Sequence, residues 1–562
     1  MQHHLSLRNK LIIMVSVMAS LFLVALDQTI ISTALGKIVE EFNAFSSLSW
    51  IVTAYLITTT ITVPIAGKFS DLFGRRNVLL VGVSIFVLAS LMSGMSGNIT
   101  ELIAWRAVQG IGGGIITANA FTIVGDLFAA RERGRWQGLI GAVFGVSSVI
   151  GPLLGGWLTD GHSILGLTTD WRWAFYINVP VGIIAFIAIA IYCPALRHAA
   201  KAKIDYIGAA LLALALATLI LAVDNTDVIF ADLLSATGMS LAVLRVIMFT
   251  IVAAATAGFI YVERKVKEPI LPLRFFKNRN FVTVLAIASL FGAAFMGSIL
   301  YLTQFNQQVF GATPTESGLM LLPMIGGVMF SSILSGQIIS RTGRYKIFMQ
   351  VGFIVATAAM IALTFLTPEM SYTYEAIVMV ILGLGMGVAM PILNLAIQNE
   401  VEQKDLGVAT SSSQLFRSLG STIGTAVFGA MLTAGLVTQV PQMRDTAYVQ
   451  SLASNEQVAK IGQIDDPNTL LTINMPGVKS KITAAAEEQF KTLPEAQAQK
   501  ASDAFTADQE AFASKVTHAF SDSLQQIFIV ASSLVGLAAV LVFTVREKEL
   551  RSASPEATPG EA

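Results

Sequence analysis

An acid and an arginine interrupt long apolar segments near the start of the chain. Asp27 is the only charged residue from Leu11 to Leu35, and Arg106 lies in another apolar segment. A charge at the centre of a spanning helix costs roughly 2.5–3.5 kcal/mol, and buried charges are normally paired. Asp27 lies about eight residues, and Arg106 about five residues, from the outer end of its apolar segment. At a rise of 1.5 Å per residue, the two side chains would therefore lie at comparable depth in the membrane. Burial favours a neutral carboxyl group and a nearby arginine favours a charged one, so the pair could bind and release a proton. A static ion pair between two helices is the alternative.

These two residues require long helices to hold them inside a membrane. A spanning helix needs about 20 mostly apolar residues, and we find fourteen such segments. They lie near residues 11–35, 48–67, 78–96, 102–123, 137–158, 173–193, 206–223, 243–262, 281–303, 318–338, 347–366, 376–396, 416–437 and 524–544. The sequence therefore predicts an all-α polytopic membrane protein with 14 transmembrane helices.

The basic residues of the connecting loops predict its orientation. Loops 97–101, 224–242, 304–317 and 367–375 contain no Lys or Arg. The loops on the other side contain Lys68, Arg75 and Arg76; Arg131, Arg133 and Arg135; Arg197, Lys201 and Lys203; Arg264, Lys265, Lys267, Arg274, Lys277 and Arg279; and Arg341, Arg344 and Lys346. Because cytoplasmic loops carry an excess of Lys and Arg, both termini are predicted to be cytoplasmic.

The composition argues against several other classes of protein. Of the 562 residues, 54% are hydrophobic and 13% are charged, and the formal net charge is zero. A soluble protein carries about 25% charged residues. The low share of charged residues argues against a soluble protein. A net charge of zero gives no reason to expect nucleic acid as a partner. The single Cys193 excludes internal disulfides and cysteine-based metal clusters, and we expect neither a metal nor another cofactor.

Neither a nucleotide-driven pump nor an intramembrane enzyme is indicated. The sequence lacks the GxxxxGK[ST] motif that cradles nucleotide phosphates, so transport would use an ion gradient or be passive. The segment GMSG, Gly94–Gly97, matches a short serine motif of intramembrane proteases, but such a serine needs a base within reach. All five histidines, at 3, 4, 162, 198 and 518, fall outside the predicted helices. Ser96 is therefore interpreted as a surface residue at the end of the third predicted helix. We do not expect the chain to be an enzyme.

One loop motif occurs twice. The connection GKFSDLFGRR spans Gly67–Arg76, and GQIISRTGRYK at 336–346 repeats it in weaker form. An ordinary basic loop would not recur near the same point of each half, so the repetition indicates a duplicated architecture. The residues of the first copy that could pack or pair at this connection are Gly67, Asp71, Gly74, Arg75 and Arg76.

The fifth predicted helix is rich in small residues. It reads GAVFGVSSVIGPLLGGWL and contains Gly145, Gly151, Pro152, Gly155 and Gly156. Small residues at spacings of four allow another backbone to approach closely, and a proline permits a kink. The segment could be a passive packing seam, or a hinge or seal between two bundles.

The segment 438–523 is unusually long and polar for a loop outside the membrane. Its second half places Phe505, Phe512, Val516 and Phe520 at spacings typical of an amphipathic helix. We predict a helix that runs into the last spanning segment and covers the outer face, with a substrate-binding element as the alternative. The tail 546–562 has the composition of a disordered segment.

The motifs together resemble those of a known transporter family. LDQTIISTALG, GKFSDLFGRR, WRAVQGIGGG, GPLLGG, WRWAFYINVPVGI (171–183), EPILPLRFFKNRNF (268–281) and QLFRSLGSTIGTAVFG (414–429) occur in the order and spacing of the fourteen-helix drug:proton antiporters. These antiporters belong to the major facilitator superfamily, and the resemblance covers about residues 10–545. It implies two six-helix bundles with two inserted helices between them, and alternating access driven by a proton gradient.

The resemblance also implies boundaries and roles. The implied parts are an N-terminal bundle at 1–200, two linking helices at 201–275, a C-terminal bundle at 276–545 that includes the loop 438–523, and the tail. Asp27 matches the family's embedded acid and Arg106 its fourth-helix arginine. Asp71 and Arg75 match the cytoplasmic gate, and the antiporter motif falls on Gly151, Pro152, Gly155 and Gly156.

The sequence departs from the family pattern at three places. Ser32 stands where Asn is common, and Gly36 stands where Pro is common. No acid occurs within the tenth predicted helix, where some polyspecific relatives carry one. This absence argues against the recognition of divalent cationic drugs.

We therefore predict proton-coupled efflux of small amphipathic or lipophilic compounds across a bacterial cytoplasmic membrane. A symporter, or an exporter of a specific lipid or metabolite, is the alternative. The expected partners are the small-molecule substrate, protons and the lipid bilayer, and the chain is expected to act as a monomer. Candidate residues of the substrate cavity are Asn119, Gln304, Asn394 and Gln398.

Overall fold

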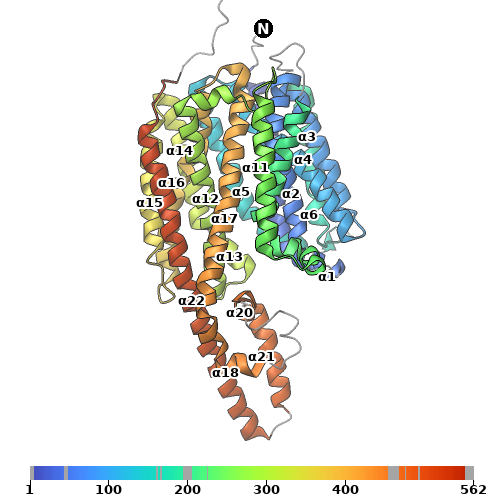
Figure 1. The fold of residues 1–562 in the computed structure, drawn as a ribbon, viewed down its shortest axis with the longest axis vertical. Coiled ribbons are helices and arrows are strands. Elements are labelled where there is room, and N and C mark those ends of the chain that lie inside the picture. The colour runs from blue at the N-terminus through green and yellow to red at the C-terminus, as the bar shows by residue number, and fades with distance from the viewer. Residues whose placement is uncertain are drawn as a thin grey trace, which may run out of the picture.

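The protein folds into a long bundle of helices (Figure 1). The computed structural model describes residues 6–42, 48–159, 163–164, 167–193, 205–223, 226–452, 467–474, 476–491 and 494–550. Within these ranges, 14 helices are long and apolar enough to cross a membrane. This number confirms the prediction from hydropathy.

The membrane-spanning helices follow one another as the apolar segments predict. They are α1 (Leu7–Phe42), α2 (Leu48–Phe73), α3 (Arg75–Gly94), α4 (Ile99–Leu127), α5 (Ala130–Thr159), α7 (Asn178–Tyr192), α8 (Tyr206–Val223), α11 (Leu241–Glu263), α12 (Arg279–Gln308), α14 (Leu322–Thr342), α15 (Lys346–Leu363), α16 (Tyr372–Gln398), α17 (Leu406–Arg444) and α22 (Glu495–Thr544). Ser32 and Gly36 fall in α1, but their side chains lie outside the described part of the structure.

Short elements connect or extend the spanning helices. They are β1 (Ser163–Ile164), β2 (Leu167–Thr168), α6 (Trp173–Tyr176), α9 (Thr226–Ile229), α10 (Ala231–Thr237), η2 (Leu273–Lys277), α13 (Pro314–Met320), η3 (Gln403–Asp405), α18 (Ala447–Leu452), α20 (Pro467–Asn474) and α21 (Pro476–Phe490). Several helices begin at residues that accept hydrogen bonds from the first-turn N–H groups. Asn98 caps α4 in this way, and Asn278 caps α12.

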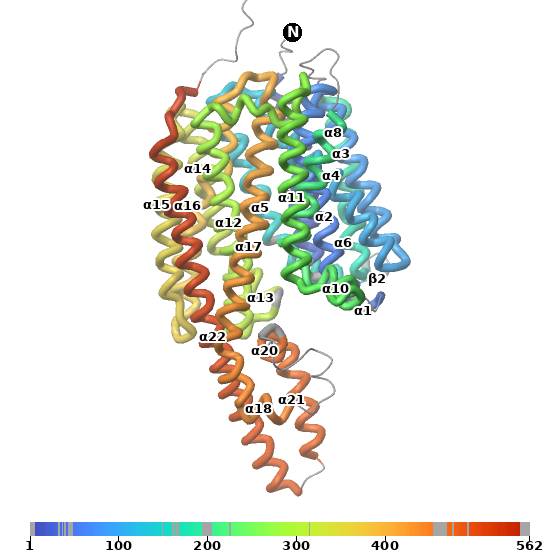
Figure 2. Tube along the Cα trace, viewed as in Figure 1, coloured from blue at the N-terminus to red at the C-terminus, as the bar shows by residue number. Residues whose placement is uncertain are grey.

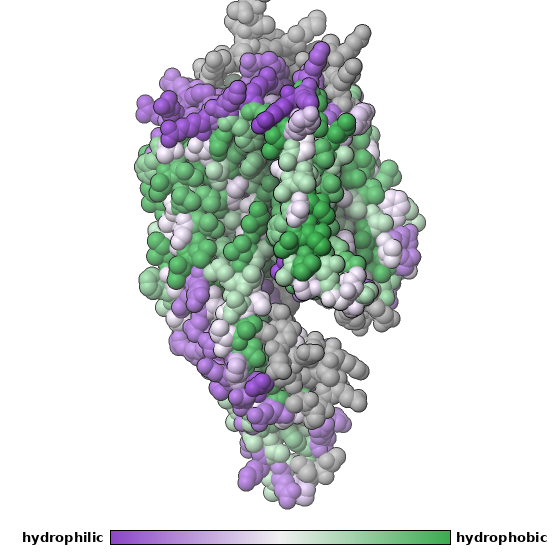
Figure 3. All heavy atoms as spheres, viewed as in Figure 1, coloured by the Kyte–Doolittle hydropathy of each residue, from purple (hydrophilic) through white to green (hydrophobic). Residues whose placement is uncertain are grey.

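The two ends of the bundle differ. The first described helix begins, and α22 finishes, at one end, which we call the gate end; the opposite end is the loop end (Figure 1 and Figure 2). A hydrophobic band covers the side of the bundle between polar side chains at the gate end and a polar extension at the loop end (Figure 3). This pattern matches an apolar bilayer core between two aqueous faces.

The helices form two groups, and each group packs around its own hydrophobic clusters. Two clusters draw on residues between Ile13 and Cys193, and one large cluster draws on residues between Phe275 and Leu550. The two groups meet along α2 against α17 and along α5 against α14. At each of these two contacts, a helix that carries a copy of the repeated loop motif, α2 or α14, packs against a helix of the other group.

The inserted helices α8 and α11 pack against each other beside the first of these meetings. Leu212 and Leu216 of α8 share a small core with Phe259 of α11 and Leu415 of α17. A further tie joins Lys68 Nζ of α2 to Glu268 Oε2 after α11, at 2.6 Å. The inserted pair is therefore attached to α2 and α17 at the gate end.

The segment predicted as a long loop is largely helical where it is described. α17 continues to Arg444 and α22 already begins at Glu495, so both project beyond the bundle at the loop end (Figure 1). The 50 residues of α22 span roughly 75 Å at 1.5 Å per residue. Phe512, Val516 and Phe520 are buried on one face, which confirms the predicted amphipathic helix that runs into the last span. His518 lies in the part of this helix that precedes the predicted span 524–544.

The first residues after α22 pack against the gate end of the bundle. The Arg546 N–H donates to Asn280 Oδ1 at 3.0 Å, and Asn280 Nδ2 donates to the Arg546 carbonyl at 2.8 Å. Lys548 Nζ forms an ion pair with Glu400 Oε2 at 2.6 Å. The predicted disordered tail is thus docked at its start, and its residues 551–562 lie outside the described part.

Candidate functional site

Asp27 and Arg106 meet in the interior of the first group of helices, as their depths predict. Arg106 Nη1 lies 2.5 Å from Asp27 Oδ2, and both side chains are only 1% exposed. α1 supplies the acid and α4 supplies the base. An arginine and a carboxylate at this distance form a charge-assisted hydrogen bond, which is stronger than a neutral one.

Two neutral residues complete the coordination of the carboxylate. Gln109 Nε2 donates to Asp27 Oδ1 at 2.8 Å, and Asn178 Nδ2 donates to the same oxygen at 3.3 Å. Sequence reasoning missed both residues. Gln109 lies three residues after Arg106, where a helix brings side chains to the same face, and Asn178 lies in the family motif WRWAFYINVPVGI.

The other atoms of the cluster are also occupied. Gln109 Oε1 accepts a hydrogen bond from Arg106 Nη1 at 2.9 Å, and the guanidinium carbon lies 4.4 Å from the centre of the Tyr55 ring. Asn178 Nδ2 donates to Ser90 Oγ at 3.0 Å. The pair is thus held by α1, α2, α3, α4 and α7. In this conformation both charged groups have hydrogen-bond partners, and a change in the charge of the pair would alter contacts that involve five helices.

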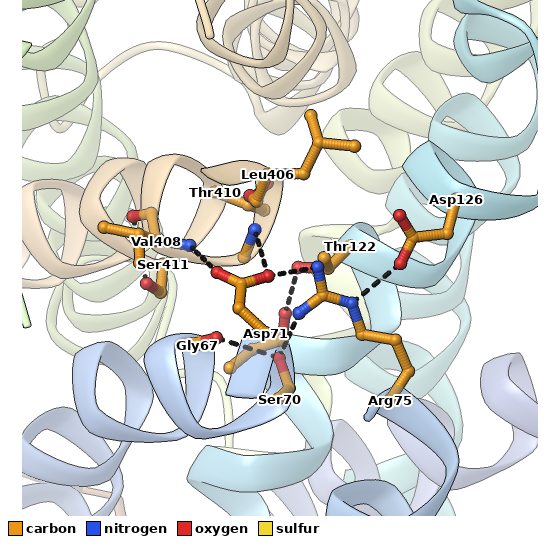
Figure 4. A network of polar contacts seen from close by, with 12 residues as sticks. Gly67, Ser70, Asp71, Arg75, Thr122, Asp126, Leu406, Val408, Thr410 and Ser411 are labelled. Atoms are coloured by element: carbon orange, nitrogen blue, oxygen red, sulfur yellow. Dashed lines mark hydrogen bonds and ion pairs between the residues drawn. The ribbon is translucent and has the colours of Figure 1, made fainter. Parts of the chain in front are cut away.

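A second buried cluster closes the gate end between α2 and α17 (Figure 4). Asp71 of α2 accepts hydrogen bonds from the Gly407 N–H at 3.2 Å and the Val408 N–H at 3.1 Å. The N-cap residue of α17, Asp405, makes no capping hydrogen bond of its own. Asp71 therefore acts as an N-cap supplied by another helix, where a negative charge is favoured by the helix dipole.

Arg75 holds Asp71 in place (Figure 4). Its guanidinium forms an ion pair with Asp71 and another with Asp126 of α4, whose Oδ2 lies 2.7 Å from Arg75 Nε. It also donates to Ser70 Oγ. The two acids flank one arginine, so α2, α3 and α4 are linked behind the contact with α17. Arg76, the next residue, donates to the Ala190 carbonyl of α7.

Glycines make both contacts between the helix groups possible. A Cβ on Gly407 would lie only 2.6 Å from the Gly67 carbonyl oxygen. At the second contact, a Cβ on Gly336 of α14 would lie 3.0 Å from the Gly134 carbonyl carbon of α5. Gly67 and Gly336 open the two copies of the repeated motif. The copies therefore perform the same packing role against different helices.

The turn after each copied helix uses a glycine in the left-handed region. Gly74 has φ 91° and Gly343 has φ 72°. Other residues are strained in this region, so each glycine permits the chain to turn from one spanning helix into the next. The copies differ at several positions, and at one of them Ser340 stands in the second copy where Asp71 stands in the first.

The glycines of α5 face two different helices. A Cβ on Gly145 would lie 2.8 Å from Met329 Cγ of α14, whereas a Cβ on Gly151 would lie 2.6 Å from Thr29 Cβ of α1. The Thr29 hydroxyl donates to the Ser147 carbonyl at 3.0 Å. Pro152 lies inside the helix, Gly155 is buried, and a Cβ on Gly156 would meet nothing within 4 Å. The motif lines a seam on both sides of α5.

The predicted cavity residues lie in different environments. Gln304 of α12 is half-buried. Asn119 and Asn394 are buried and donate to carbonyls of their own helices, at 2.8 and 3.3 Å. Gln398 lies inside the closed contact, where it accepts from Gln137 Nε2 at 3.0 Å and donates to Thr410 Oγ1 at 3.0 Å. Access of a substrate to Gln398 would require another conformation.

The second group of helices contains an embedded acid that the sequence analysis placed in an outer loop. Glu375 lies in the first turn of α16 and is fully buried. In the described part of the chain, neither carboxylate oxygen has a hydrogen-bond partner, although Asn306 of α12 lies close enough to interact. Its position at the boundary of the apolar segment concealed it. Among the searched residues, no group of three or more His, Cys, Asp or Glu could hold a metal ion.

Comparison with known proteins agrees with this architecture. Residues 17–425 match the family model described as Major Facilitator Superfamily. The Bacillus subtilis "Multidrug transporter protein MdtP" is 39% identical over 427 residues, which are 76% of this chain and 76% of that protein. "Multidrug resistance protein 3" of the same species is 34% identical over 423 residues, covering 75% and 79%.

Solved structures show the same fold at low sequence identity. The human organic anion transporter MFSD10 (TETRAN) has a TM-score of 0.56 and 16% identity, covering 75% of this chain and 93% of that one. An inward-facing bacterial homologue of the human lysosomal transporter Spinster has a TM-score of 0.55 and 16% identity, covering 97% and 99%.

Proposed function

This chain belongs to the major facilitator superfamily, and on that premise we propose that it exports small amphipathic or lipophilic compounds in exchange for protons. The observation that carries the proposal is the embedded Asp27–Arg106 pair, whose cost is explained if the carboxyl group takes part in transport. The names of the two Bacillus relatives support drug-like substrates. The proposed location is a bacterial cytoplasmic membrane, with the gate end in the cytoplasm.

Proton binding at Asp27 would act through the cluster that surrounds it. A neutral carboxyl group would lose the ion pair with Arg106, while Gln109 and Asn178 would remain as hydrogen-bonding neighbours. Five helices would therefore feel the change. Coupling requires that the proton and the substrate prefer different conformations, so protonation from outside would displace substrate and proton release inside would restore the pair.

The gate end would open in the other conformation. Opening would remove the Asp71 carboxylate from the α17 N-terminus and separate the glycines of both contacts. Gln398 would then become accessible between α5 and α16. The closed gate described here fits the half of the cycle in which the proposed cavity faces away from the cytoplasm.

Reconstituted vesicles test the proposal. The full-length protein would be placed in liposomes with an imposed proton gradient, and the movement of amphipathic dyes and of protons would be measured together. We expect dye and protons to move in opposite directions. Movement in the same direction would contradict antiport and favour a symporter. Proton-independent dye movement would contradict the coupling. Selective movement of a single lipid or metabolite would contradict the multidrug assignment.

A further inference from the structure

An arginine in the first third of α17 has no carboxylate partner among the residues that the structure describes. Arg417 follows the start of the helix at Leu406 by about eleven residues, roughly 16 Å along the axis. This is about half of the 30 Å apolar core of a bilayer. Arg417 is half-buried, and its guanidinium makes one side-chain hydrogen bond in the described part of the chain, from Nη2 to Gln414 Oε1 at 2.9 Å.

Gln414 adds a second donor that lacks an acceptor. Its side chain is 3% exposed, and its Nε2 has no hydrogen-bond partner among the described residues. Because arginine has only donors, the Gln414 oxygen must face Arg417 and the amide nitrogen must point elsewhere. Two hydrogen-bond donors, one of them charged, therefore lie side by side, and no described residue offers them a negative group.

Two other deeply buried arginines are compensated. Arg106 is paired with Asp27, and Arg75 is paired with Asp71 and Asp126. No ion pair of Arg417 occurs in the described part of the structure. A charge held away from water without a partner is costly, so a membrane protein that keeps one requires a compensating ligand or a function.

Packing alone does not account for the arginine. α17 contacts α12 through backbone and small residues at this level: a Cβ on Gly292 would lie 3.0 Å from the Arg417 carbonyl carbon, and Ser421 Oγ donates to the Gly292 carbonyl at 3.0 Å. The guanidinium takes no part in these contacts. Arg417 is only half-buried, so part of the residue is accessible to a ligand.

We propose that Arg417 and Gln414 form a binding site for the anionic group of an exported compound, such as a carboxylate on an amphipathic molecule. The guanidinium fork can bind both oxygens of a carboxylate, and the Gln414 amide can donate to one of them. The proposal rests on the proposed export function and specifies a substrate class for it. The motif QLFRSLGSTIG, which had no assigned role, thereby acquires one.

Binding of an acid and its neutral ester tests the site. The probes are 1-pyrenebutyric acid and its methyl ester, measured by fluorescence with full-length protein in lipid nanodiscs and with empty nanodiscs subtracted. We expect the wild type to bind the acid about tenfold more tightly than the ester, a difference of about 1.4 kcal/mol. Arg417→Gln should bring the ratio near one, and Arg417→Lys should retain part of it because lysine keeps the charge without the fork.

Matched variants separate the site from a general effect of charge or folding. Arg444→Gln removes an exposed charge near the far end of the same helix and should preserve the ratio. Gln414→Ala should reduce the ratio by a few-fold, and it provides a second test if Arg417→Gln unfolds. Equal binding of acid and ester by the wild type, or an unchanged ratio in Arg417→Gln, would overturn the site. So would competition by chloride or acetate as strong as that of the acid, because this would indicate a site for any small anion.

Transport assays distinguish failure of the site from failure of the proposed function. Proton-driven dye efflux combined with equal binding of acid and ester would overturn the anion site alone. Acid-selective binding that Arg417→Gln abolishes, without any proton-driven efflux in vesicles, would overturn the proposed function alone.

Discussion

At the scale of single residues, embedded charges carry the information about function. The pairing of Asp27 with Arg106 could be predicted because a charge in an apolar segment is costly and needs a partner. Gln109 and Asn178 could not be found in this way, since neutral amides occur in helices at little cost. Glu375 was missed because it lies at the end of its apolar segment. Sequence reasoning therefore identifies the ion pair, whereas the structure identifies the groups that form hydrogen bonds with it.

Replacement of the embedded acid tests the proton coupling. In Asp27→Asn, the amide keeps the shape of the side chain but cannot exchange a proton, so we expect proton-driven efflux to fall by about 5–150-fold, the range of typical coupling free energies. The measurement is dye efflux from vesicles with and without a proton gradient. Asp232→Asn, an exposed acid of α10, should leave efflux unchanged. Undiminished efflux by Asp27→Asn would show that the pair is a static ion pair.

At the scale of elements, the repeated loop motif predicted the duplicated architecture but not the contacts that it makes. Sequence comparison within the chain relates Gly67 to Gly336, and the structure places both against helices of the other group. The role of Asp71 as a cap for α17 depends on a contact between residues more than 300 positions apart. No local pattern encodes such a contact, so only the three-dimensional arrangement reveals it.

Removal of the capping charge should weaken the closed gate. Asp71→Asn replaces one accepting oxygen by an amide donor and so loses one of the two hydrogen bonds from the Gly407 and Val408 N–H groups; a capping interaction is worth about 0.5–2 kcal/mol. We expect a cysteine at Ser411, which is buried against Gly67, to react with a maleimide severalfold faster in this variant. Cys193 would be replaced by Ser in all proteins. Asp405→Asn, which removes a charge at the same helix end without removing a capping bond, should react as the parent does; equal acceleration would contradict the capping role.

Close backbone approach at the second contact should be sensitive to a single methyl group. Gly336→Ala places its Cβ against the Gly134 backbone, and overpacking of this kind costs about 1–3 kcal/mol. Gly326→Ala on the same helix has nothing within 4 Å of the added atom. We expect a lower thermal unfolding temperature for Gly336→Ala than for Gly326→Ala. Equal temperatures would show that the two helix groups are not held together at this glycine.

At the scale of the whole molecule, hydropathy predicted the fourteen helices, since each span must be long and apolar in any packing arrangement. It could not predict which end of the bundle is closed, because the hydropathy of each span is the same in every conformation. It also did not predict that α17 and α22 extend beyond the bundle. Outside an apolar core, the helix signal is only a weak amphipathic period, and the projecting part has to be seen in three dimensions.

Docking of the C-terminal segment at the gate end should depend on pH through Glu400. Burial alone raises the pKa of Glu400, but hydrogen bonds from Lys548, Asn278 and Asn280 lower the pKa below its ordinary value overall. A carboxyl group with a lowered pKa stabilises the folded contact above its ordinary pKa of about 4.3, and this stabilisation is lost as the pH falls through the folded value. We therefore expect amide hydrogen exchange at Arg546 and Lys548 to report the same docking stability from pH 7 to pH 5, after correction for intrinsic exchange rates, and a loss below about pH 4. Glu400→Gln should expose these amides to exchange throughout the pH range. Glu402→Gln, which changes an exposed neighbour, should leave them protected. A loss of docking between pH 7 and pH 5 in the wild type would show that another group controls the contact.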